Sequence, residues 1–202
     1  MPNTSRPKGF TVVKHLSGAP YNGQGNIYYV SSAADEILAG DVVKLGGSAD
    51  ANGIPTADLC GATDVPIGIV LGIFQSKFDP VGKMTTGAVS LDLPAAAQIA
   101  ASGSGYILVA DSPDIVMEAE TSNGTPAAAD IGLNISHANA ARTANTVVSP
   151  ATLDVGTKAT TSTLNFNLQS FVQRPDNEIG ASAKMLVIFN RHQYKSVGTT
   201  GI

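Results

Sequence analysis

Short strand-like segments separated by turn-forming residues run along most of the chain, and they constrain its fold more than any other feature. Nine or more such stretches are rich in Val, Ile, Leu, Phe, Tyr or Thr, and Gly, Pro, Asn or Asp bounds most of them. This spacing predicts an all-β fold, a β-sandwich or barrel-like core with little helix. The clearest predicted strands are 10–16, 26–32, 41–45, 66–74, 88–93, 106–110, 115–120, 164–172 and 185–190.

Local patterns add two finer expectations. The segment Asp111-Ser112-Pro113-Asp114 has the residues of a tight turn, so the strands on either side of it are predicted to form a hairpin. Residues 93–101 are predicted to be the one helix of the first half, because Pro94 suits a first helical turn and alanines follow it. No repeat of fixed period is visible.

The organisation expected from composition is an arm followed by one domain. Residues 1–17 begin with a Pro-rich stretch and are predicted to form an extended N-terminal arm. Residues 18–202 have a length that suits a single β-rich domain. Within it, 121–163 is rich in Ala, Ser and Thr and poor in charge, which predicts a long loop excursion held by a neighbouring subunit.

Charge is low and unevenly distributed. Charged residues make up 14% of the chain, against about 25% in an ordinary soluble domain, and such a surface suits packing against other proteins. Residues 35–178 hold all 16 acidic residues and six of the 12 basic ones, whereas both ends are basic. Scattered basic residues without interleaved aromatics argue against direct nucleic-acid binding. No apolar stretch reaches bilayer length, and the single Cys60 predicts synthesis in a reducing cytoplasm.

The familiar frames of catalysis are missing from the sequence. It has no Gly-x-Ser-x-Gly elbow, no P-loop and no complete dinucleotide fingerprint. His15, His137 and His192 are too scattered to predict a metal site, and Cys60 reads as an inert apolar residue. We therefore expect no catalytic residue, no cofactor and no metal.

Two pairs of carboxylates are candidates for an acid–base or cation site. Asp111 and Asp114 more simply stabilise the turn that contains them. Glu118 and Glu120 fall on one side of a predicted strand and are expected to mark its solvent-facing side.

Five segments together resemble the cement, or decoration, proteins of tailed-bacteriophage capsids. They are 38–45, 65–70, 106–114, 171–180 and 184–194, of which the last two are the most specific. The resemblance implies a β-rich homo-oligomer on the outer surface of the virion shell, bound to the major capsid protein and without catalytic activity. A trimer, which would suit local three-fold positions, is favoured, and a dimer, which would suit two-fold positions, stays open.

An extended arm can add a strand to an exposed sheet edge of a neighbour. Residues 1–17 are accordingly predicted to bind the capsid, with basic side chains pairing with acids on the shell and apolar ones filling pockets. The predicted capsid-binding residues are Arg6, Lys8, Phe10, Val12, Lys14 and Leu16.

Two other classes of function stay open. The first is another phage β-module, such as a tail, fibre or glycan-binding component, although the chain has no Trp and five Tyr to stack on sugars. The second is a small β-barrel enzyme that uses Asp111, Asp114 or His137, and it requires these side chains to meet in one pocket.

Overall fold

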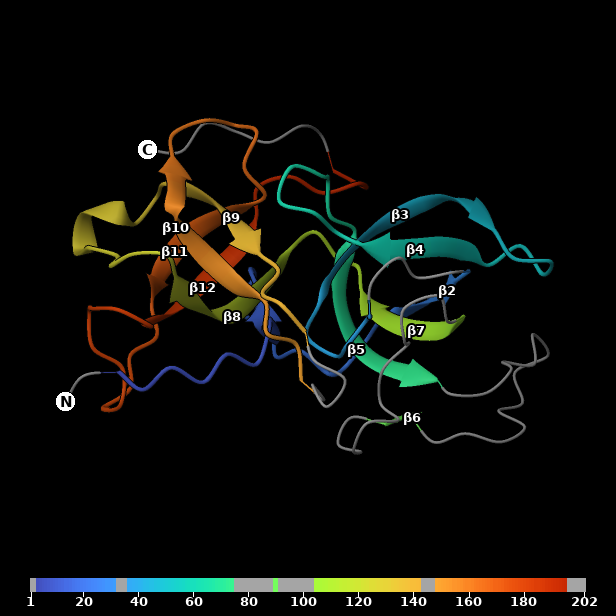
Figure 1. The fold of residues 1–202 in the computed structure, drawn as a ribbon, viewed down its shortest axis with the longest axis horizontal. Helices are drawn as coiled ribbons and strands as arrows, with labels where there is room; N and C mark the ends of the chain where they lie inside the picture. Colours follow the sequence, from blue (N-terminus) through green and yellow to red (C-terminus); the bar gives the residue numbers. More distant parts are fainter. Residues whose placement is uncertain (1–2, 32–35, 75–88, 91–103, 143–147, 196–202) are drawn as a thin grey trace.

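A computed structural model describes residues 3–31, 36–74, 89–90, 104–142 and 148–195. In these residues the chain is nearly all β-strand, which confirms the predicted all-β, barrel-like core (Figure 1). The elements are β1 (Thr11–His15), β2 (Asn26–Val30), β3 (Val42–Ala49), β4 (Pro55–Leu59), β5 (Gly68–Phe74), β6 (Val89–Ser90), β7 (Gly105–Ala110), β8 (Ile115–Ser122), the 3-10 turn η1 (Ala128–Asp130), β9 (Asn134–Ala138), β10 (Thr152–Ala159), β11 (Phe166–Phe171) and β12 (Lys184–Phe189).

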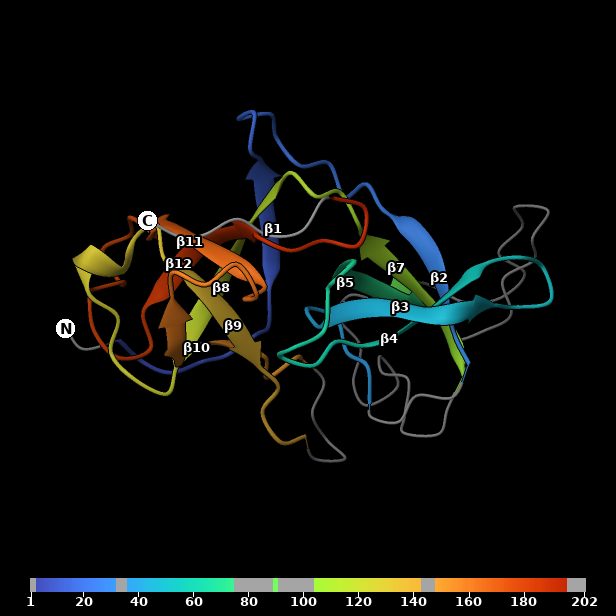
Figure 2. The ribbon, with the colours of Figure 1, turned by 90° about the horizontal axis from the view of Figure 1, so that it is seen from above.

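The strands form two closed barrels that lie side by side (Figures 1 and 2). The first barrel consists of β2, β3, β4, β5 and β7, and it closes where β3 pairs with β5. The second barrel consists of β8 to β12, and it closes where β8 pairs with β12. Strand β6 adds to the edge of β5, and β1 adds to the edge of β8.

The two barrels have the same strand topology. In chain order within each barrel, the first strand pairs in parallel with the third and antiparallel with the fifth. The second strand pairs antiparallel with the third and the fourth, and the fourth pairs antiparallel with the fifth. Five matching pairings of matching direction show that the chain carries one barrel architecture twice.

The match extends to single hydrogen bonds. In the first barrel, Gly40 donates its N–H to the carbonyl of Val70, and the Val70 N–H returns a bond to the carbonyl of Asp41. In the second, Gly132 donates to Leu168, and Leu168 returns a bond to Leu133. Both glycines have a positive φ, 89° and 92°, and a β-bulge directly follows Val70 and Leu168 alike.

Unequal connections hide this duplication in the sequence. Gly132 lies 92 residues after Gly40, and Leu168 lies 98 residues after Val70. The register pairs Ile107 with Tyr28 in the first barrel and Met185 with Ala119 at the corresponding place in the second. Met185 nevertheless lies only 78 residues after Ile107. No fixed period survives such length differences.

A shared apolar cluster joins the barrels. Val42, Cys60, Ile69 and Ala110 of the first barrel pack in the same cluster as the interior residues of the second. A hydrogen bond also crosses the junction. The Cys60 carbonyl, on the connection between β4 and β5, accepts it from His137 Nε2 at 2.8 Å. In the described residues of 18–202, each barrel therefore has its own interior cluster, and the cluster of the second barrel extends across the junction into the first.

A buried ion pair, which we call the Asp41 latch, closes the same junction. Arg142, on the β9–β10 connection, lies 2.8 Å from Asp41 Oδ1, and both side chains are largely buried. Ser149 donates its hydroxyl to the same oxygen at 2.5 Å, and the Leu38 amide donates to Oδ2. Arg142 also donates to the carbonyl of Glu36. One barrel supplies the carboxylate and the other its cation.

The latch makes stability depend on pH. Burial outweighs Arg142, Ser149 and Leu38, and it raises the pKa of Asp41 from 3.8 to about 6. The folded chain thus binds this proton more tightly than the unfolded chain does. The contribution of Asp41 to the free energy of unfolding is therefore fully present below pH 3.8 and is lost as pH rises through about 6. We expect Asp41→Asn to flatten this fall in urea-unfolding free energy between roughly pH 4 and 6. An equal fall in both proteins would contradict the assignment.

Two sequence expectations are wrong. Strands β7 and β8 both exist, but they belong to different barrels, so the turn at 111–114 links the barrels and forms no hairpin. The span 121–163 is not one long loop excursion, because it contains the end of β8, η1, β9 and β10. The expected arm, residues 1–17, contains β1, which pairs on one side with the chain's own β8. The helix expected at 93–101 lies outside the described residues.

Candidate functional site

The N-terminal arm lies against the second barrel. Gly9 adopts a φ of 70°, and a Cβ there would come within 2.5 Å of the Gly40 carbonyl oxygen, so only glycine allows this approach. The turn inserts Phe10 into the core, where it is 2% exposed and stacks on Phe166 with ring centroids 4.8 Å apart. The prediction that Phe10 binds the capsid is therefore wrong, because its ring is buried within its own chain.

Strand β1 presents a different set of side chains from the predicted one. The register against β8 shifts between Val12 and Lys14, so a bulge falls at Val13. Val12 packs against the core cluster, whereas Val13 is 43% and Leu16 51% exposed. Lys14 is exposed between them. Of the predicted apolar anchors, only Leu16 lies on the surface, and Val13 joins it.

Polar contacts hold the arm on the outward side of β8. Asn3 donates to the carbonyls of Glu178 and Ala181 and accepts the Glu178 amide. Ser5 donates its hydroxyl, and Arg6 its backbone amide, to the carboxylate of Glu120. The guanidinium of Arg6 and the ammonium of Lys8 stay exposed.

Glu118 and Glu120 are buried, contrary to the expected solvent-facing role. Glu118 is 7% exposed and accepts two hydrogen bonds of 3.0 Å from Arg174, and Lys8 lies 3.9 Å away. Glu120 is 4% exposed under the arm. Alternation correctly puts both on the outward side of β8, but it carries no information about the segment that covers them.

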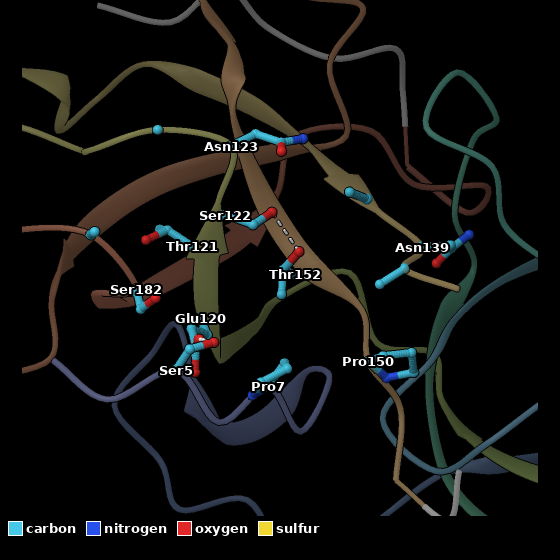
Figure 3. A pocket seen from close by; sticks show the side chains of 14 residues that line it. Ser5, Pro7, Glu120, Thr121, Ser122, Asn123, Asn139, Pro150, Thr152 and Ser182 are labelled. Atoms are coloured by element: carbon cyan, nitrogen blue, oxygen red, sulfur yellow. Dashed lines mark hydrogen bonds between the residues drawn. The ribbon is translucent and has the colours of Figure 1, made fainter. Parts of the chain in front are cut away.

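An open groove of about 620 Å³ lies beside the arm (Figure 3). Strands β8 and β10 pair through only two residue pairs at its inner end, where the hydroxyls of Ser122 and Thr152 lie 2.7 Å apart. Figure 3 shows Ser5 against Glu120 on one side and Asn139 with Pro150 on another. The lining residues are Ser5, Pro7, Glu120, Thr121, Ser122, Asn123, Gly124, Ala138, Asn139, Ala140, Pro150, Thr152, Ala181 and Ser182.

The carboxylates considered for catalysis have separate structural partners. Asp111 accepts the Asn26 amide and the Tyr28 hydroxyl, and Asp114 is 3.9 Å from Lys195. The predicted role of this pair in its own turn is thus replaced by contacts with other segments.

The histidines and the cysteine also lie apart. His137 is buried against the Cys60 carbonyl, and burial lowers its pKa. Burial, followed by the charge of Asp64, raises the pKa of the Cys60 thiol to about 12, as suits an inert residue. His192 is buried and His15 half-buried near Tyr21. Within the described ranges, no three His, Cys, Asp or Glu residues are placed to hold a metal ion.

The groove was not predicted, because its walls come from the arm, β8, the end of β9, the β9–β10 connection, β10 and the β11–β12 connection, which meet only in the fold. Across the described parts of the chain, no helix has the length and apolarity needed to cross a bilayer. Comparison with protein-family models, curated proteins and solved structures found no match to this chain.

Proposed function

We propose that this chain is a virion structural protein that binds the outer surface of a tailed-phage capsid and cements it. In this role it contacts the major capsid protein as a homo-oligomer, favoured as a trimer, and transforms no substrate. The resemblance described above motivates the proposal. The duplicated barrel, whose junction is packed and latched, supplies a rigid body that can carry load between two contacts.

The edge of β1 is the observation that carries this proposal. It is the terminal strand of its sheet and pairs with β8 on one side only. Its other side is met at Lys14 by the bridge to Pro20, and no second strand of the described residues pairs with it. Val13, Lys14 and Leu16 are exposed there. Such an edge accepts an added strand through main-chain bonds, with side-chain pockets giving specificity.

Cementing needs only modest affinity at each contact. Many copies bind one shell at once, so weak individual contacts combine into a large resistance to expansion or rupture. Strand addition suits this task because the hydrogen bonds that it makes do not require charged groups to be buried. The basic side chains of Lys14 and Arg6 would speed association with an acidic shell surface.

Single substitutions on β1 test the proposal. We expect Leu16→Asp and Val13→Asp each to weaken binding to empty shells of the cognate capsid protein at least tenfold, because each puts a charge into an apolar pocket. Cosedimentation with the shells measures the binding. Ile179→Asp is the matched control, since Ile179 is 57% exposed and lies outside β1, on the β11–β12 connection, and it should bind normally. Normal binding by both β1 variants, or no binding by the unaltered protein, would overturn the proposal.

A further inference from the structure

We propose that the groove beside the arm binds a lysine or arginine side chain carried on an extended segment of a partner protein, with Glu120 as the counter-ion. This inference adds a second binding site to the β1 edge and does not depend on the proposed function. It rests on the burial and partners of Glu120, on the chemistry of the groove lining, and on the comparison between the two barrels.

Glu120 is a buried carboxylate that no cation of the described residues neutralises. Its two oxygens accept one neutral donor each, the Ser5 hydroxyl at 2.7 Å and the Arg6 amide at 2.9 Å. Each oxygen keeps capacity for a further bond. No Lys or Arg nitrogen of the described residues forms an ion pair with it, including Lys184, which lies opposite in strand register. Two residues earlier, Glu118 has both Arg174 and Lys8.

Thr121, the next residue along β8, forms part of the groove wall but offers its hydroxyl to no ligand. It is 1% exposed, and alternation along the strand turns its side chain to the opposite side from Glu120. The remaining lining offers hydroxyls and amides to the backbone of a ligand.

The first barrel shows that the architecture does not require a carboxylate here. In the second barrel, strand register places Glu120 opposite Lys184. At the corresponding position of the first barrel, it places Tyr29 opposite Tyr106. The tyrosine rings contact each other with centroids 5.1 Å apart, so an uncharged pair builds the same strands. The charge of Glu120 is therefore a feature of the second barrel alone, and the groove lies beside it.

The chemistry of the lining selects the ligand class. A lone carboxylate among neutral donors and acceptors complements one cation. None of the 14 lining residues is aromatic, which disfavours sugar stacking, and the groove is open and flanked by strand ends, as an extended peptide requires. A basic side chain on such a segment fits both features.

Titration of the isotopically labelled full-length chain with a short peptide tests the site. The probe is a blocked pentapeptide, Ala-Ser-Lys-Ser-Ala, and its control is the same peptide with an acetylated lysine. We expect saturable amide shifts confined to the groove residues with the first peptide only. Glu120→Gln should weaken binding at least tenfold, because the charge-assisted bond is lost. Asp114→Asn removes an equal charge elsewhere and should leave binding unchanged.

A second pair of variants keeps the test decisive if Glu120→Gln loosens the arm. Ala140→Trp should block the groove and abolish the shifts, whereas Ala129→Trp, on an exposed residue outside the groove, should not. Equal binding of the acetylated peptide, no saturation up to about 10 mM, or normal binding by Ala140→Trp would each overturn the proposal. None of these results bears on shell binding through β1.

Discussion

Replacing Phe10 with alanine is expected to lower the free energy of unfolding by about 3–5 kcal/mol. The ring is 2% exposed and stacks on Phe166, so its removal leaves a cavity between the arm and the interior of the second barrel. Denaturation in urea measures the loss, which corresponds to a fall in Tm of roughly 6–20 °C for a chain of this size. The arm thus stabilises the barrel that it covers.

The control is Val13→Ala in the same part of the chain. Val13 is 43% exposed, so the change should stay within about 0.5 kcal/mol. A Phe10→Ala variant as stable as the control would show that the ring does not belong to the core. The same reasoning predicts that removing residues 1–17 destabilises the remaining domain, because it deletes Phe10 and β1 together.

Replacing Arg142 with methionine should cost about 3–5 kcal/mol of unfolding free energy at neutral pH. Methionine keeps much of the length of the side chain but leaves the Asp41 carboxylate buried without its cation. The exposed fractions of the two side chains, 8% and 0%, place this pair among buried ion pairs, where losing one partner is expensive. Urea unfolding at pH 7 is the measurement.

Unfolding at acidic pH and a second substitution identify the cause of the stability loss in Arg142→Met. Below the pKa of Asp41 the carboxyl group is neutral, so the deficit of Arg142→Met should shrink at about pH 4. Adding Asp41→Asn should restore part of the stability at pH 7, because the uncompensated charge is then gone. A deficit that is independent of pH and unrelieved in the double variant would point to lost packing in place of lost charge.

Local signals predicted the strands well. The expected segments 26–32 and 106–110 coincide with β2 and β7 to within two residues, since β-branched and aromatic runs bounded by Gly, Pro or Asp carry their own structural information. Strands β9 and β10 were missed because Asn, Ser, His, Thr and Lys fill them, and these residues resemble a loop unless the pairing partner is known.

Which strands pair was beyond the sequence. The chain crosses between barrels at Asp111–Asp114, where turn chemistry is the same whether the next strand pairs back or leaves. The bulge at Val13 breaks the alternation of β1, so that Val13 and Lys14 are both exposed, and neither residue signals it. Glu120 was placed on the right side of its strand, but its burial depends on Ser5 and Arg6, more than 100 residues away.

The repeated barrel has a consequence for behaviour at low concentration. Two subunits that associate through an interface separate on dilution, because their encounter depends on concentration. Here the equivalent units share one polypeptide, so the effective concentration of each for the other is fixed by the linker. A molecule released singly into a large volume therefore keeps both of its barrels together.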